Sequence, residues 1–262
     1  MPAQSPIALV TGASCGLGAE VARHLARTGA HVIVNHRNRR GEADTVVGAI
    51  RRSGGHASAV AADIVDDDAV TAMIDDVAHR FGHLDTLVLN AVTSTDAKPA
   101  KRDAQRRLVE AALPLMAPGA RIVFITSNQA HFYPDKGVLK GYEPIAASKR
   151  ADETTLYAMR AEFGRRGIHC TVVSGDFVDT LADDGTDCAQ VVNLFPQHDP
   201  AVPEFAAAVA RASVEPHPLS IVYAAGHQAA VSAAADGPVE ALAAWHAAGG
   251  SAKSVRTLAN AG

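Results

Sequence analysis

Residues 6–29, PIALVTGASCGLGAEVARHLARTG, join a short apolar run to an amphipathic one through a turn rich in glycine. The first run, PIALVTG, is typical of a buried strand, and LGAEVARHLARTG has apolar residues at helical spacing before Gly29 stops it. Glycines at Gly12, Gly16 and Gly18 let the backbone turn tightly and approach a pyrophosphate, whose charge is favoured at a helix N-terminus. The stretch therefore predicts the first strand–turn–helix unit of a nucleotide-binding sheet.

The same alternation continues through most of the chain. Strands are expected at residues 6–12, 31–37, 57–64, 84–92, 121–127, 169–177 and 219–226, and helices at 17–29, 41–55 and 66–82. Near-continuous apolar strands that alternate with helices imply a parallel sheet covered on both faces. We therefore predict an α/β fold, a doubly wound Rossmann-type sheet in a single domain over residues 1–262, since no linker or repeat divides the chain.

Two regions depart from this alternation. Residues 180–218 form a long polar, proline-bearing excursion, which is typical of a substrate lid when ordered strands flank it. Its apolar side chains fit either a roof over a flat ligand or ordinary packing: Phe195, Pro196, Val202 and Phe205. Residues 227–262 are expected to form a C-terminal extension with one helical segment, PVEALAAWHAA.

Composition excludes several classes of function. A net charge of −4 gives no electrostatic case for nucleic acid or anionic membrane as a partner. The start of the chain lacks a basic segment ahead of its first apolar run, so it is expected to be a strand and not a signal peptide, and no apolar run is long enough to cross a bilayer. Cys15, Cys170 and Cys188 form no CxxC pair, and the 12 histidines show no HxH or HExxH spacing. We therefore expect a cytoplasmic protein without a disulfide framework or metal site.

Four motifs together resemble the short-chain dehydrogenase/reductase family. They are TGxxxGxG at residues 11–18, Asn90–Ala91 after the fourth strand, Ser127 after the fifth, and Lys149 preceded by a serine. The resemblance covers residues 6–180 and includes the late strand. It implies a nicotinamide cofactor and either carbonyl reduction or alcohol oxidation.

The resemblance also implies a set of cofactor contacts. Asn90 and Ala91 are expected beside the adenosine ribose, Asp63–Ile64 beside the adenine, and the Thr180 hydroxyl at the nicotinamide carboxamide. Asp63 also fits a simple cap at the end of a strand. The glycine turn itself contributes Gly12, Ser14, Cys15, Gly16, Leu17 and Gly18.

The second strand predicts which nicotinamide cofactor is bound. A carboxylate at its end would bind a ribose 2′-hydroxyl and repel a 2′-phosphate, but no acid occurs from Val34 to Arg40. Arg37 offers a planar guanidinium suited to a phosphate, and Asn38 can donate a hydrogen bond. We therefore expect NADPH, with NADH less favoured; the alternative is a solvated basic loop without a ligand.

The expected catalytic residues are incomplete. In the family a serine orients the carbonyl, a tyrosine donates the proton, a lysine holds the nicotinamide ribose and lowers the tyrosine pKa, and an asparagine carries a proton relay. Ser127 and Lys149 match the serine and the lysine. The tyrosine position falls on Ile145, which cannot donate a proton, and no asparagine occurs near residues 101–103, where one is expected.

We expect the proton to come from the substrate or from water, with Tyr142 and Tyr133 as backup donors. Pro144 favours a place for Tyr142 in the loop before the helix, and His131 is a further candidate within the protein. A substrate with a hydroxyl beside its ketone can stabilise its own alkoxide, and water then completes the transfer. The last alternative is no reaction at all, in a redox sensor or regulator that binds NADP(H).

The segment YEPIAASKRA adds a narrower resemblance, to angucyclinone ketoreductases of the simocyclinone type, which tailor aromatic polyketides in actinomycetes. It implies a ketoreductase of antibiotic biosynthesis that acts on a small-molecule aromatic ketone. The retained Ser127, Lys149 and Thr180 favour an enzyme over a sensor. The family often forms homo-oligomers through helices that flank the active site, and for this chain the oligomeric state is left open.

Overall fold

A computed structural model describes residues 5–91, 103–135, 137–138, 142–175, 201–216, 218–225 and 228–231. The strands are β1 Ile7–Val10, β2 His31–His36, β3 His56–Ala61, β4 Thr86–Leu89, β5 Arg121–Ser127, β6 His169–Gly175, β7 Ile221–Ala225 and β8 Gln228–Val231. The helices are α1 Gly16–Arg27, α2 Arg40–Arg52, α3 Asp67–Phe81, α4 Ala104–Ala112, α5 Asn128–His131, α6 Glu143–Ala158, α7 Arg160–Arg166 and α9 Ala201–Ala212, with the short 3-10 helix η2 at Leu113–Leu115.

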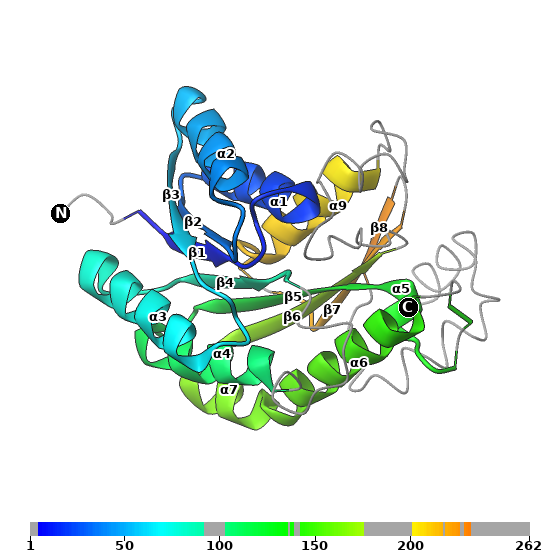
Figure 1. The fold of residues 1–262 in the computed structure, drawn as a ribbon. Helices are drawn as coiled ribbons and strands as arrows, with labels where there is room; N and C mark the ends of the chain where they lie inside the picture. Colours follow the sequence, from blue (N-terminus) through cyan, green and yellow to red (C-terminus); the bar gives the residue numbers. More distant parts are fainter. Residues whose placement is uncertain are drawn as a thin grey trace.

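The described strands form one sheet in the order β3-β2-β1-β4-β5-β6-β7-β8. Strands β1 to β7 pair in parallel, and β8 pairs antiparallel with β7. Helices α1, α2 and α9 cover one face, while α3, α4, α6 and α7 cover the other (Figure 1). The predicted doubly wound Rossmann-type fold is confirmed.

Helix ends follow from local chemistry. The Asp66 side chain caps α3 by accepting hydrogen bonds from the backbone N–H groups of Asp68 and Ala69. The helix ends at Gly82, whose φ of 75° lies in the left-handed region. Acidic residues in the first turn also favour the positive end of the helix dipole. The acidic run DDD is therefore explained by helix capping.

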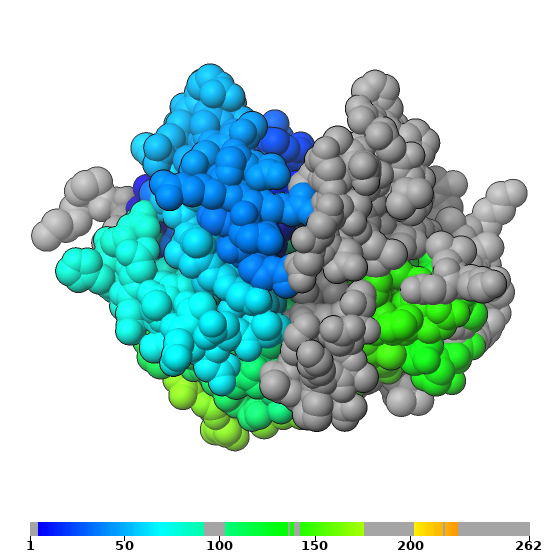
Figure 2. Space-filling model, in the orientation of Figure 1, coloured from blue at the N-terminus to red at the C-terminus, as the bar shows by residue number. Residues whose placement is uncertain are grey.

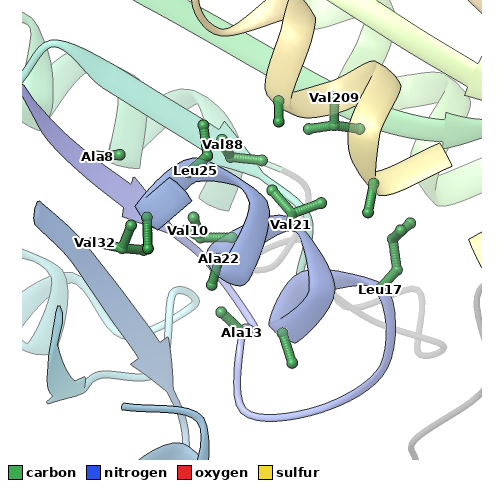
Figure 3. Close-up of a cluster of buried hydrophobic side chains, with 14 of the residues drawn as sticks. Ala8, Val10, Ala13, Leu17, Val21, Ala22, Leu25, Val32, Val88 and Val209 are labelled. Carbon is green, nitrogen blue, oxygen red and sulfur yellow. The ribbon is translucent and has the colours of Figure 1, made fainter. Parts of the chain in front are cut away.

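The core on the α1 face is closed by a helix from far along the chain. Val209 of α9 lies against Leu17 and Val21 of α1, above Val88 of β4 (Figure 3). Phe205 is only 3% exposed, and Val202 packs against the same cluster. These two apolar residues of the 180–218 excursion therefore serve as packing, whereas residues 180–200 lie outside the described residues.

Two further expectations meet the structure at its C-terminal end. The late strand predicted at 219–226 is observed as β7, and β8 was not predicted. The helical segment expected at 238–248 lies outside the described residues. Within the described part of the chain, no helix has the length and apolar character to cross a membrane.

One face of the molecule shows the surfaces of both halves of the fold. In the space-filling view, the surface of α2 and α3 (blue and cyan) lies on one side and that of the segment around α5 and α6 (green) on the other (Figure 2). Strands β1 and β4 lie between them, at the point where the order of the strands along the sheet reverses. In open α/β sheets ligands bind outside the carboxyl ends of the strands at this switch point.

Candidate active site

Buried hydrogen bonds fix the glycine turn after β1. The Asn90 side-chain amide donates to the backbone oxygens of Thr11 and Gly12, both at 3.1 Å. The Thr11 hydroxyl accepts from the N–H groups of Asn90 and Ala91, and Asn35 Oδ1 accepts from Gly12 N at 3.2 Å. The turn is thereby tied to β4 and β2, on both sides of β1.

Three glycines give the turn its shape. Gly12 and Gly16 have φ of 60° and 56°, which side chains rarely adopt. A Cβ on Gly18 would lie 2.6 Å from both Asn90 Nδ2 and Gly12 O, so the helix can approach the turn only without one. Over Gly16 a Cβ would meet no atom within 4 Å. The turn is thus close-packed at Gly18 and open at Gly16.

This open side fits a dinucleotide. Helix α1 has no acidic residue in its first turn, and Cys15, its N-cap, makes no side-chain capping bond. A phosphate at this N-terminus would meet the positive end of the helix dipole without a competing carboxylate. Nearby, Asn90 Oδ1 is buried without a hydrogen-bond partner among the described residues, which leaves an acceptor for a ribose hydroxyl.

The predicted phosphate-binding residues lie at the end of β2. Arg37 and Asn38 are exposed. Arg37 Nη1 lies 3.9 Å from Asp63 Oδ2, and the other Asp63 oxygen accepts from the N–H of Val65. Asp63 therefore does close the turn after β3, while its second oxygen faces Arg37. The neighbouring Ile64 is buried.

Ser127 and Tyr142 form a buried hydroxyl pair. Ser127 ends β5, and its Oγ lies 3.0 Å from the Tyr142 hydroxyl, with either atom able to donate. The two residues are each 3% exposed. Ser127 Oγ also accepts from Ala130 N and so caps α5. Two hydroxyls at this spacing can both donate to one carbonyl oxygen.

Tyr142 is the N-cap of α6 and has helical backbone angles, φ −89° and ψ −12°. It was expected before the helix, and it lies directly ahead of the first helical residue, Glu143. Pro144 falls in the first turn, where its missing N–H costs no hydrogen bond. The proline therefore starts the helix just after Tyr142, whose hydroxyl still reaches Ser127.

Ile145 occupies an apolar cluster with Ala130, Tyr142 and Ala146, and is 2% exposed. Tyr133 packs against the edge of this cluster. The aliphatic side chain therefore contributes to the packing that seats Tyr142 beside Ser127.

Lys149 lies two helical turns beyond Tyr142 on α6. Its side chain is buried, and Nζ donates to the Ile125 carbonyl of β5 at 3.2 Å. The ammonium also lies 5.9 Å from the centroid of the Phe124 ring. Lys149 of α6 therefore contacts β5 two residues before Ser127, near the carboxyl end of the strand.

Several polar residues of the site were missed in the sequence analysis. Asn128 is buried, and its Oδ1 accepts from Ser174 Oγ at 2.7 Å. Asn35 is a further example, although an asparagine in a buried strand already requires a hydrogen-bond partner. Thr11 belongs to the glycine motif but was not singled out.

A second group of buried polar side chains lies along α6. His131 Nδ1 is 2.7 Å from Glu153 Oε1, and His131 Nε2 is 3.1 Å from the Tyr223 hydroxyl. Burial, followed by the Glu153 carboxylate, raises the pKa of both Tyr157 and Tyr223. His131, a candidate acid from the sequence, thus contacts Glu153 and Tyr223.

Some predicted positions lie outside the described residues: Thr180, Cys188, Phe195, Pro196 and the segment 92–102. Among the residues that are described, no group of three or more His, Cys, Asp or Glu side chains could hold a metal ion.

Comparison with known proteins places this geometry in a family. A family model described as short chain dehydrogenase matches residues 6–187. The chain is 34% identical to 1-cyclohexenylcarbonyl-CoA reductase of Streptomyces collinus over 66% of its length and 65% of the relative's. It is 32% identical to versicolorin reductase stcU of Emericella nidulans, over 66% of this chain and 69% of that one.

A solved structure shows the same fold. The angucycline C-6 ketoreductase LanV, crystallised with bound NADP, is 25% identical, with a TM-score of 0.65 over 84% of this chain and 94% of that one.

Proposed function

The chain belongs to the short-chain dehydrogenase family of oxidoreductases, and we propose that it is an NADPH-dependent ketoreductase that reduces a ketone of a polycyclic aromatic polyketide in antibiotic biosynthesis. One observation carries the proposal. The hydroxyls of Ser127 and Tyr142 lie 3.0 Å apart at the end of β5, and the helix that Tyr142 begins carries the buried Lys149.

NADPH is the proposed cofactor because the glycine turn and the end of β2 suit its charged groups. Gly12, Gly16 and Gly18 would hold the pyrophosphate at the start of α1, and Arg37 would pair with the 2′-phosphate. Asp63 and Ile64 would contact the adenine, and Asn90 and Ala91 the ribose. LanV, which shares the fold, was crystallised with NADP.

The reaction needs a hydride and a proton. When bound, NADPH supplies the hydride to the carbonyl carbon, and the carbon–oxygen double bond becomes an alkoxide. Ser127 Oγ–H holds the carbonyl oxygen by a hydrogen bond. The Tyr142 hydroxyl then gives its proton to the alkoxide oxygen, which yields the alcohol. Lys149, fixed by the Ile125 carbonyl, holds the ribose and supplies positive charge near the developing anion.

Tyr142 is therefore the proposed proton donor, in place of a tyrosine at position 145. Ile145 is buried among apolar side chains and offers no proton. A hydroxyl beside the substrate ketone is the second candidate donor, since positioning alone supplies much of the catalysis of hydride transfer. Tyr133 is less favoured because it packs at the edge of the cluster.

The substrate class rests on the relatives. LanV is described as an angucycline C-6 ketoreductase, and the Emericella nidulans relative is named a versicolorin reductase. Because this chain covers only about two thirds of the curated relatives' length, the aromatic ketone is part of the proposal. So is a cytoplasmic location, which the absence of a cysteine pairing motif supports.

The test is NADPH oxidation with a panel of fused aromatic ketones, each with and without a free hydroxyl beside the carbonyl. Turnover of both forms supports Tyr142 as the donor, whereas turnover of only the free-hydroxyl forms favours a proton from the substrate. NADPH binding without any turnover would reject the ketoreductase and favour a redox sensor.

A further inference from the structure

The imidazole of His131 connects three elements, α5, α6 and β7. His131, the last residue of α5, lies between Glu153 of α6 and Tyr223 of β7, at 2.7 Å and 3.1 Å. The side chains of His131 and Glu153 are 2% and 0% exposed. The proposed reaction uses none of these three groups.

The cluster contains a costly group. Removing a carboxylate from water costs several kcal/mol of hydration free energy, and charged or polar partners must offset this cost. Glu153 has two such partners, since Arg150 Nη1 lies 3.4 Å from the same oxygen that faces His131. Burial raises the pKa of Tyr223, so its hydroxyl keeps its proton and can donate to His131.

Helix α5 depends on such contacts because it is only one turn long. A helix of four residues is not stable by itself. Ser127 caps its first end, and Ala130 packs in the cluster with Tyr142. At its other end the Phe132 ring stacks on Tyr223, with centroids 6.0 Å apart and planes 7° from parallel. The position of α5, and with it that of Ser127, is set by neighbouring elements.

We propose that His131, Glu153 and Tyr223 are positioning residues that lock α5 against α6 and thereby align Ser127 with Tyr142 and Lys149. Glu153 lies four residues after Lys149, one turn along the same helix, so the lock joins the elements that carry the serine and the lysine. The inference rests on the proposed ketoreductase function, because it names the residues that align that site.

Kinetics of three variants test the lock. Glu153→Leu removes the partner of His131, Glu153→Gln keeps a polar side chain of the same length without the carboxylate charge, and Tyr223→Phe removes only a hydroxyl. We expect kcat to fall by up to about 100-fold in Glu153→Leu, as for a misplaced catalytic group, and by less in the other two. The Kd for NADPH should change much less than kcat, because Lys149 is the only proposed cofactor contact next to the lock and the others lie at the glycine turn between β1 and α1 and at the ends of β2, β3 and β4.

Glu162→Gln, at a surface carboxylate of α7 that pairs with arginines, is the matched control and should keep the wild-type kcat. Tyr223→Phe keeps the His131–Glu153 contact and the ring stack, so it tests the lock even if Glu153→Leu does not fold. An unchanged kcat in Tyr223→Phe, or equal losses in Glu153→Gln and Glu153→Leu together with weaker NADPH binding, would overturn the proposal.

Hydrogen exchange separates this inference from the proposed function. In Tyr223→Phe and Glu153→Gln, the backbone amide of Ala130, bonded to Ser127 Oγ, should exchange faster than in the wild type, while amides of α1 stay unchanged. If the wild type reduces no ketone, the proposed function fails and exchange alone decides the lock. Unchanged exchange in α5 would overturn it whatever the kinetics show.

Discussion

The Tyr142 hydroxyl lies 3.0 Å from Ser127 Oγ, although Tyr142 stands seven residues before Lys149 and Ile145 stands four before it. The hydroxyl reaches the serine from the helix N-cap, and Ile145 fills the apolar cluster beneath it. The proposed proton donor is therefore the N-cap of the helix, and the apolar side chain that supports it lies in the first turn.

Replacement of Tyr142 by Phe removes this hydroxyl and keeps the ring in the cluster. If Tyr142 is the acid, kcat falls by about 10²–10⁴-fold, with the Kd for NADPH unchanged. Steady-state kinetics and fluorescence titration of NADPH measure the two effects. Tyr133→Phe is the comparison at the other candidate. A fall in kcat in Tyr133→Phe, with Tyr142→Phe fully active, would identify Tyr133 as the proton donor instead.

A tyrosine at position 145 should not restore a family-like site. The Ile145 side chain is buried against Ala130 and Ala146, so a larger ring overpacks the cluster. We expect Ile145→Tyr to lose about 1–3 kcal/mol of unfolding free energy and to lower kcat, because Tyr142 is displaced. Urea unfolding and kinetics check this; a stable, more active variant would contradict it.

Arg37→Ala should change cofactor preference. Loss of a charge-assisted hydrogen bond at an exposed site lowers NADPH affinity by about 10-fold, while NADH affinity is unchanged. The ratio of the two dissociation constants is the measurement. Arg52→Ala, at the far end of α2, removes an exposed arginine away from the site and serves as the control. An unaltered ratio in Arg37→Ala would refute the phosphate contact.

Gly18→Ala should abolish cofactor binding with the sheet intact. The added Cβ would lie 2.6 Å from Asn90 Nδ2 and from Gly12 O, so the turn or the helix must move. Gly41→Ala is the matched control, because a Cβ there meets nothing within 4 Å. Calorimetric titration with NADPH compares the two. Wild-type affinity in Gly18→Ala would show that the turn tolerates the shift.

The cysteines offer a test without substrate. Burial raises the pKa of the Cys170 thiol to about 12, so the thiol stays protonated at pH 8 and thiolate-dependent alkylation is slow. Cys15, at the start of α1, should be labelled by iodoacetamide before Cys170, and NADPH should slow its labelling. Peptide mass spectrometry resolves the individual cysteines. Labelling of Cys15 at a rate independent of NADPH would argue against a cofactor at this turn.

The sheet and the cofactor turn were predictable because each depends on local rules. Buried parallel strands show as apolar runs, and Gly12 and Gly16 are needed where φ is positive. Strand β8 was missed because the four residues QAAV lack β-branched or aromatic side chains apart from one valine. Its pairing with β7 comes from tertiary structure.

The reaction site was harder to predict because its contacts join distant elements. Nothing in the order of residues shows that the Tyr142 hydroxyl meets Ser127, since this depends on how α6 docks against β5. The approach of His131 to Glu153 and Tyr223 likewise requires three elements at once. Asn35 could have been identified from the sequence, because a polar side chain in a buried strand requires a hydrogen-bond partner.

The return of α9 to α1 has a consequence for any shortened version of this chain. Phe205 and Val209 pack in the same core as Leu17 and Val21, beside the turn that holds Gly12 (Figure 3). A chain cut ahead of Ala201 would expose the apolar flank of its own first helix to water. The nucleotide-binding half therefore cannot be separated as a module at β6, because the helix that covers α1 is synthesised only after that strand.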